Sequence, residues 1–462
     1  MKKPDRRTVP EILQHPRWDP LAATLNMGAV TAPQLRVLDD FLAFIEGRQI
    51  ASIWELSVSD CLSFDAGYRS ANRLRALKKA MQAVFPAQPA ILVLTDAIRR
   101  KEAQTRKPAA TAPRRRKLRV SIPEEELPEH WKSALADMAA GFDGDGVIAP
   151  SPKMIPTYRM KLRQLACSAR KAGVPEEISV EAVKAFTRDM RGRGLAAATQ
   201  LASFSALKKC ARYVGADQEA QELLSQLLRK AEDQARKAPK KKYKKLQKTG
   251  YSPVAIIGRA EEFLKEAESL TCPRSRQALR NTAAALALFS VLPVRLADTR
   301  LVFGEHLSWR QGRYELHITL SKDDETYDAE IDPRLNVFID ALILRGCDEA
   351  WLDQMRNGCL KSNRPLFVRN DGGGVGYNYI SDCWRSVFGT GEHIARTILH
   401  TFLGVELGAA GTDMALAANG QKSPRTAADY QDQMVAKAQR LQGQKAFEDM
   451  VGGVNLKLFE FT

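Results

Sequence analysis

The sequence predicts a multidomain protein with two all-α modules in its N-terminal half and a mixed α/β domain with a small antiparallel sheet at its C-terminal end. Three observations support this prediction. The chain has 462 residues, more than one hydrophobic core usually organises. Two stretches rich in Lys and Arg, 105–119 and 236–248, interrupt it. Apolar residues recur at helical spacing before the second stretch, and strand-like alternation occurs only after it.

We place the domain boundaries where the composition changes. The predicted parts are an N-terminal helical module (1–103), a basic linker (104–122), a second helical domain (123–235), a Lys-rich linker (236–250), and a C-terminal domain with its tail (251–462). Pro, Ala and Arg without periodicity are typical of interdomain linkers, which is why the first basic stretch is assigned as one.

The two helical modules share a pattern. In the first, residues 31–86 have apolar positions at helical spacing, interrupted by Gly47 and Gly67. Each module also contains the letters ALKK in a basic helix, at 76–79 and 206–209. Two interpretations stay open, the duplication of one helical module or the chance similarity of short helical bundles.

The C-terminal domain begins with helical patterns over 252–270 and 276–292. An alternating segment then predicts two strands around a turn at Gln311-Gly312, followed by the polar turn SKDDET and a returning strand, YDAEI. Helical spacing resumes after Pro333 and continues toward the end. This order of elements predicts a mixed α/β domain.

The charge of the chain indicates a nucleic-acid partner. The formal net charge is +16 and the isoelectric point about 9.5, with the excess concentrated in the two basic stretches. Lys and Arg side chains that neutralise phosphates release counterions, which is the main sequence-independent source of DNA affinity. We therefore expect a nucleic-acid partner. The candidate DNA-binding residues are Arg114, Arg115, Arg116, Lys117, Lys240, Lys241, Lys242, Lys244 and Lys245.

Other features of the composition argue against several classes of protein. The seven cysteines stand singly without C-x-x-C spacing, and the six histidines are dispersed, so we expect no metal site, no disulfide framework and no cofactor. No run of 18 apolar residues occurs, and the basic N-terminus lacks an apolar segment behind it. We expect a cytoplasmic, nucleoid-associated protein that makes no membrane contact.

Several residues that can carry chemistry follow one another in the C-terminal domain. Arg295 stands after a hydrophobic helix, with Asp298 one turn later. Lys322 lies in the polar turn between two predicted strands. Further on, EHIARTILHTFLG contains His393, Arg396 and His400, and Tyr430 follows Gln421 by nine residues.

These segments, between about residues 250 and 435, resemble the tyrosine recombinase (phage integrase) family. That family has an arginine box, a lysine in a β-hairpin turn, an H-x-x-R-H-T-F box, an L-G-H-x-S segment and a nucleophilic tyrosine. Arg295, Lys322, His400-Thr401-Phe402 and Tyr430 stand in the matching places. The resemblance implies a tyrosine recombinase-like catalytic domain preceded by two DNA-binding modules. It also implies site-specific recombination through a covalent 3′-phosphotyrosyl intermediate, for the integration or excision of a mobile element.

The second box departs from the family, and two alternatives stay open. Aligned through His400, the family's histidine falls on Arg396 and its second arginine on Leu399, so the second catalytic arginine is missing. Alternatively, His393 and Arg396 form the H-x-x-R pair one helical turn early. Gln421 replaces the histidine of L-G-H; its amide donates hydrogen bonds but cannot shuttle a proton near neutral pH.

The chemistry explains why these residue types are needed. Attack by a tyrosine on a DNA phosphodiester builds negative charge on the phosphate, which the forked guanidinium of Arg295 stabilises. Lys322 can protonate the departing 5′-oxygen as a general acid. Tyr430 is the candidate nucleophile. The remaining candidate catalytic residues are Arg396, His400, Gln421 and His393.

The resemblance also bears on assembly. In the family a C-terminal segment often packs on a neighbouring protomer, and the tail VNLKLFEF alternates apolar residues as a groove-binding strand would. We expect a homo- or hetero-tetramer on DNA that exchanges these tails, with packing of the tail in cis as the alternative. The alternative function is a catalytically impaired homologue that binds DNA as an accessory subunit of an active recombinase complex, since Leu399 and Gln421 depart from the catalytic set.

Overall fold

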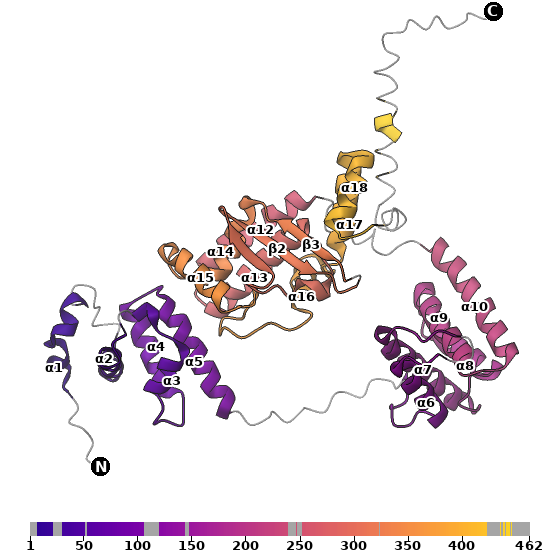
Figure 1. Cartoon of the computed structure of the whole chain (residues 1–462), viewed down its shortest axis with the longest axis horizontal. Coiled ribbons are helices and arrows are strands. Elements are labelled where there is room, and N and C mark those ends of the chain that lie inside the picture. Colours follow the sequence, from indigo (N-terminus) through magenta and orange to yellow (C-terminus); the bar gives the residue numbers. More distant parts are fainter. Residues whose placement is uncertain are drawn as a thin grey trace, which may run out of the picture. The chain divides into compact units, whose positions relative to one another are not determined.

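The structure is a computed structural model that describes residues 7–21, 30–50, 53–105, 120–143, 147–238, 252–322 and 324–422, with 246, 435, 438, 440–443 and 445. The described chain is mostly helical and contains a three-stranded antiparallel sheet (Figure 1). It divides into two compact units, Met1–Pro108 together with Lys241–Thr462, and Ala109–Lys240. None of the described helices is long and apolar enough to cross a membrane.

Helices are the only regular elements among the described residues in the N-terminal part of the first unit. They are α1 (Val9–Leu13), η1 (Pro16–Leu21), α2 (Ala32–Gly47), η3 (Ile53–Glu55), α3 (Val58–Phe64), α4 (Asn72–Val84) and α5 (Pro89–Thr105). Trp18 donates its indole N–H to the buried Asp39 carboxylate at 3.0 Å, and Lys101 forms a buried ion pair with Asp65. These partners lower the cost of burying polar groups beside the apolar core.

The second unit, described by itself, is also helical. Its elements are α6 (Glu129–Ala140), η4 (Pro152–Met154), α7 (Ile155–Ala172), α8 (Val180–Gly192), α9 (Ala197–Tyr213) and α10 (Gln218–Lys237). The side chains of Ser179 and Asp217 cap the N-termini of α8 and α10, and glycines in the left-handed conformation end α6 and α7. One apolar cluster around Trp131 and Phe186 holds the helices together.

The C-terminal part of the first unit combines helices with the sheet. Its helices are α12 (Pro253–Ser269), α13 (Pro273–Val291), η5 (Leu296–Thr299), η6 (Pro333–Leu335), α14 (Asn336–Leu344), η7 (Glu349–Trp351), α15 (Leu352–Lys361), α16 (Tyr379–Phe388), α17 (Ile394–Glu406) and α18 (Gly408–Ala418). Helix α13 is buried along much of its length, because α12, α14, α16 and α17 all pack on it. It is therefore the central helix of this part.

The sheet confirms the predicted strand order. Strands β1 (Leu307–Arg310), β2 (Arg313–Thr319) and β3 (Thr326–Glu330) pair antiparallel in the order β1-β2-β3. Gln311 and Gly312, at φ 47° and 81°, form the tight turn between β1 and β2, a conformation that suits two-residue hairpin loops. Tyr314, Leu316 and Ile318 of β2 point into the core shared with α13, as their alternation predicts.

Candidate functional site

The segment around Arg295 leaves the buried end of α13. Pro293 and Val294 are buried, and Arg295 is the half-buried N-cap residue of η5. Asp298, one turn later and 8% exposed, accepts a hydrogen bond from the backbone N–H of Ser321 at 3.0 Å. This bond joins the Arg295 segment directly to the turn between β2 and β3.

Lys322 lies in that turn, immediately after Ser321, and its side chain is exposed. The turn is tight, because Asp324 adopts a positive φ of 50° and donates its N–H to the Leu320 carbonyl at 3.0 Å. The lysine is thus carried on a short loop whose backbone is tethered while its ammonium group faces solvent. Such an arrangement suits a group that protonates a bound substrate.

Helix α17 carries the second box. His393 is its exposed N-cap residue, whereas Arg396, Leu399 and His400 are all buried. Arg396 is 2% exposed and donates to the backbone carbonyl of Asn419, just beyond the C-terminal end of α18. The guanidinium therefore links α17 to the segment that leads into Gln421.

His400 and Gln421, two of the predicted site residues, lie in direct contact. His400 Nε2 is 2.9 Å from Gln421 Oε1. An amide oxygen only accepts hydrogen bonds, so in this pairing the imidazole Nε2–H donates. Gln421, in the place of the L-G-H histidine, is thereby held beside α17 although it comes 21 residues later in the chain.

The β2–β3 hairpin also contacts the segment around Gln421. The Tyr327 hydroxyl on β3 donates to the Ala418 carbonyl at 2.9 Å. A Cβ added at Gly420, which has φ +56°, would lie 2.5 Å from Leu320 Cδ1, so the chain passes close to the hairpin there. Lys422 forms an ion pair with Glu325 in the turn. One hairpin therefore contacts both the Arg295 segment and the Gln421 segment.

Burial has electrostatic consequences in this region. It raises the pKa of the Tyr327 hydroxyl to about 12, against an opposing effect from the nearby Arg396 charge. Thr401 Oγ1 and Asn419 Oδ1 are buried and have no hydrogen-bond partner in the described part of the chain. Buried polar atoms without partners are uncommon in native proteins and call for an explanation, such as a functional role.

A cavity of about 470 Å³ borders the contact between Asp298 and Ser321. Its wall includes Thr299, His306 and Tyr377 besides these two residues. Asp298 Oδ2 is buried and has no hydrogen-bond partner within the described ranges. The hairpin turn thus borders open space at Ser321, and the next residue, Lys322, is exposed.

Several predicted site residues lie outside the described residues. These are Tyr430, the cations Arg114, Arg115, Arg116, Lys117, Lys240, Lys241, Lys242, Lys244 and Lys245, and the tail VNLKLFEF. Of the described candidates, the structure joins His400 to Gln421. A hydrogen bond from the Ser321 backbone N–H to the Asp298 carboxylate connects the segments of Arg295 and Lys322, and His393 lies at the exposed N-terminal end of α17.

Sequence reasoning missed the residues that connect the segments. Ser321 acts through its backbone, and Asn419 through its carbonyl, so neither side-chain type gave a signal. Tyr327 stood in a predicted strand, where an aromatic residue is ordinary. The sequence places Asp298 one turn after Arg295 but does not indicate that its carboxylate accepts the Ser321 N–H. The R-x-x-D spacing was the one available signal for Asp298.

The chain is similar to solved structures but matches no family model and no curated protein. Among solved structures, a XerH site-specific recombinase bound to palindromic difH substrate in a post-cleavage complex is similar over 92% of this chain and 98% of its own, with 13% identity and a TM-score of 0.30. The pre-cleavage complex of XerH with difH substrate covers 90% and 96%, with 14% identity and a TM-score of 0.31. These scores are too low to assign a function.

Proposed function

We propose that the chain is a site-specific DNA recombinase, a tyrosine-type strand transferase whose nucleophile is Tyr430. The observation that carries the proposal is the β2–β3 hairpin. It carries Lys322, and it contacts the Arg295 segment on one side and the Gln421 segment on the other. One hairpin thus connects segments of three separate candidate motifs, which supports the proposal.

In the proposed reaction the phenolate of Tyr430, its proton lost to solvent, attacks the scissile phosphorus, and the bond from phosphorus to the 5′-oxygen breaks. Lys322 gives its proton to that leaving oxygen, and Arg295 stabilises the charge on the non-bridging oxygens. A 3′-phosphotyrosyl bond remains. Religation reverses the step when the 5′-hydroxyl of a partner strand attacks, so the bond energy is conserved in the covalent intermediate.

His400 and Gln421 have the role of positioning or binding groups in this proposal. The His400 imidazole donates to the Gln421 amide oxygen, which leaves the amide N–H groups of Gln421 available to a phosphate oxygen.

We propose that the protein works on double-stranded DNA in the cytoplasm, as a homo- or hetero-tetramer with tail exchange. We also propose that the chain is divided into the five parts 1–103, 104–122, 123–235, 236–250 and 251–462.

One experiment tests the enzyme. The protein is incubated with nicked suicide duplexes that tile the DNA flanking its gene, and covalent protein–DNA adducts are sought on a denaturing gel. We expect an adduct that Tyr430→Phe abolishes while DNA binding persists. If no duplex forms an adduct, even with the partner recombinases of the same element present, the enzyme proposal fails.

A second candidate function is an accessory DNA-binding subunit without its own cleavage activity. The engagement of Arg396 with the Asn419 carbonyl favours it, because this guanidinium is buried and already donates within the fold. The buried Leu399, in the place of the second arginine, favours it too. An accessory subunit would have no need of Arg295, Lys322 and Tyr430 together, which favours the enzyme.

Two substitutions separate the alternatives for the second box. If Arg396 acts on the phosphate, Arg396→Ala removes the adduct under conditions where the variant is folded and binds DNA. If the second arginine is missing, Leu399→Arg raises adduct formation. Circular dichroism and DNA binding of each variant show whether an effect on cleavage reflects lost folding.

A further inference from the structure

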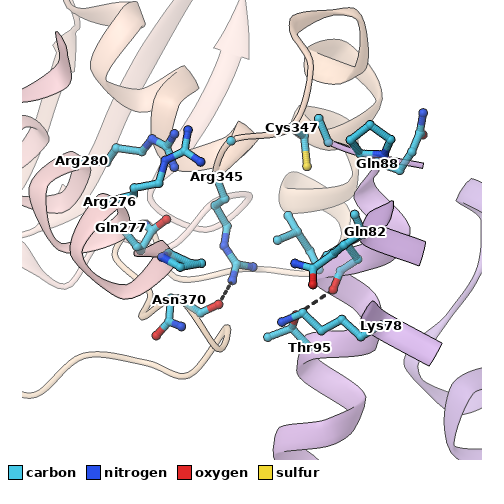
Figure 2. A pocket seen from close by; sticks show the side chains of 16 residues that line it. Lys78, Gln82, Gln88, Thr95, Arg276, Gln277, Arg280, Arg345, Cys347 and Asn370 are labelled. Carbon is cyan, nitrogen blue, oxygen red and sulfur yellow. Dashed lines mark hydrogen bonds between the residues drawn. The ribbon is translucent and has the colours of Figure 1, made fainter. Parts of the chain in front are cut away.

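A second cavity, of about 250 Å³, lies within the first unit and away from the proposed catalytic residues. Helices α4 and α5 form one wall, and the first turn of α13 with the chain after α14 forms the other. The backbone N–H of Asp348 donates to the Ala87 carbonyl at 3.3 Å beside it. Figure 2 shows Arg345 reaching into the space, with Lys78 on the opposite wall.

Four basic side chains line this cavity: Lys78, Arg276, Arg280 and Arg345. Glu268 pairs with two of them, Arg276 at 3.1 Å and Arg280 at 2.7 Å. Asp96, a further carboxylate near Arg345, pairs with Arg99 and Arg100 on its own helix. Positive charge therefore exceeds negative charge around the cavity, and Lys78 has no carboxylate partner among the described residues.

Arg345 is held in an unusual backbone conformation. It ends α14 at φ 53°, in the left-handed region that non-glycine residues seldom adopt. Its guanidinium donates to the Asn370 carbonyl at 2.7 Å, and its Nε is buried without a partner within the described chain. Gly346 follows at φ +89°, and a Cβ there would lie 3.2 Å from an Arg280 nitrogen. Strain kept at a charged residue is typical of binding sites.

Burial makes this excess of charge costly. It lowers the pKa of Lys78, and the neighbouring charge of Arg345 lowers it further. Burial likewise lowers the pKa of Arg345 to about 10, with a contribution from the Arg364 charge. An anion placed between these groups would replace their lost hydration and remove their mutual repulsion. The positive end of α13, whose first turn reaches the cavity, would add to the attraction.

We propose that this cavity binds a small phosphate anion, such as pyrophosphate or a phosphomonoester. Its volume is below the roughly 300–1,000 Å³ of pockets for drug-sized ligands, and it cannot admit a duplex. Forked guanidinium groups match phosphate oxygens in pairs, and the amide groups of Gln82, Gln88 and Asn370 supply further polar contacts. Because its two walls belong to helices far apart in sequence, a bound anion would tie them together.

Isothermal titration calorimetry of the full chain with pyrophosphate tests the proposal. We expect binding to the unaltered protein, and dissociation constants raised about tenfold or more in Lys78→Gln and Arg345→Gln, since each loses a charge-assisted hydrogen bond. The control is Arg310→Gln, an exposed arginine on β1 outside the cavity, which should bind as the unaltered protein does.

A second variant separates lost binding from lost folding. Arg345→Gly removes the guanidinium but suits the left-handed backbone at this position, so it should stay folded and still lose affinity. The proposal is overturned if pyrophosphate does not bind, or if Arg345→Gly and Lys78→Gln bind it normally. It is also overturned if Arg345→Gly weakens only duplex DNA binding. None of these outcomes bears on the Tyr430 adduct.

Discussion

At the scale of single residues, Arg396 combines a predicted catalytic role with a buried position in the fold. A guanidinium that is 2% exposed and bound to the Asn419 carbonyl contributes to folding whether or not it also contacts DNA. If Arg396 also contacts DNA as proposed, one side chain serves both substrate recognition and structural support. The hydrogen bond places the carbonyl of Asn419, and through it the start of the segment toward Tyr430.

Arg396→Ala should lower the free energy of unfolding by about 2–4 kcal/mol, because it leaves a cavity and an unsatisfied buried carbonyl. Hydrogen exchange of α17 and α18 amides in urea measures this locally. Arg385→Ala, on the exposed side of α16, is the control and should change stability by no more than about 0.5 kcal/mol. Equal stability of the two variants would mean that Arg396 has no structural role.

The pKa of Tyr327 predicts a loss of stability in alkali. Burial raises it to about 12 in the folded chain, from the ordinary value of 10.0. Between these values the unfolded chain releases the proton and the folded chain keeps it, so stability is complete below about pH 10 and falls as pH rises toward 12. Thermal unfolding midpoints from pH 9 to 12 should fall less steeply in Tyr327→Phe than in the unaltered protein. An unchanged slope would contradict the assignment.

At the scale of elements, the β2–β3 hairpin is the part that joins the candidate motifs. Helices α17 and α18 pack against each other, and Gly411 of α18 lies so close to α17 that an added Cβ would overlap the Leu403 carbonyl. The end of α18 then contacts the hairpin through Ala418 and Gly420. A displacement of the hairpin would therefore move Lys322 and Gln421 together.

Gly420→Ala should weaken this contact. The residue has φ +56°, and the new Cβ would overlap Leu320 on the hairpin, so we expect a loss of about 1–3 kcal/mol and impaired cleavage. Gly358→Ala is a matched control, since Gly358 lies in α15 with open space around it. It should raise stability by about 0.5–1 kcal/mol. Urea unfolding of both variants makes the comparison, and similar effects would refute the predicted contact.

At the scale of the whole molecule, DNA affinity should depend on the two basic stretches. Replacing Arg114, Arg115, Arg116 and Lys117 by Gln should reduce the slope of log Kd against log salt by up to about 4, roughly one per lost phosphate contact. The matched control replaces Arg310, Arg313, Arg334 and Arg385, which form ion pairs with carboxylates on their own unit. The slope of log Kd against log salt should change less in this control variant than in the variant of residues 114–117. Equal changes would show that the stretch is not a DNA contact.

Much of the fold followed from local patterns. The turn at Gln311-Gly312 and the alternation of β2 predicted the three strands and their order, and helical spacing predicted α13. Strand and helix periods are properties of short segments, so a local pattern is enough to predict them. The candidate residues Arg295, Lys322 and Tyr430 followed from motif spacing alone. Their catalytic roles remain predictions.

Tertiary structure decided which of these segments meet. The bond from Ser321 to Asp298, the Arg396 contact with Asn419 and the approach of Gly420 to Leu320 all involve backbone atoms or residues far apart in the chain. A sequence pattern carries no information about such contacts, since every residue except proline has the same backbone N–H and C=O groups. The sequence by itself determined the elements and the chemistry they can carry. Packing determined that one hairpin joins the motifs and that Arg396 is buried.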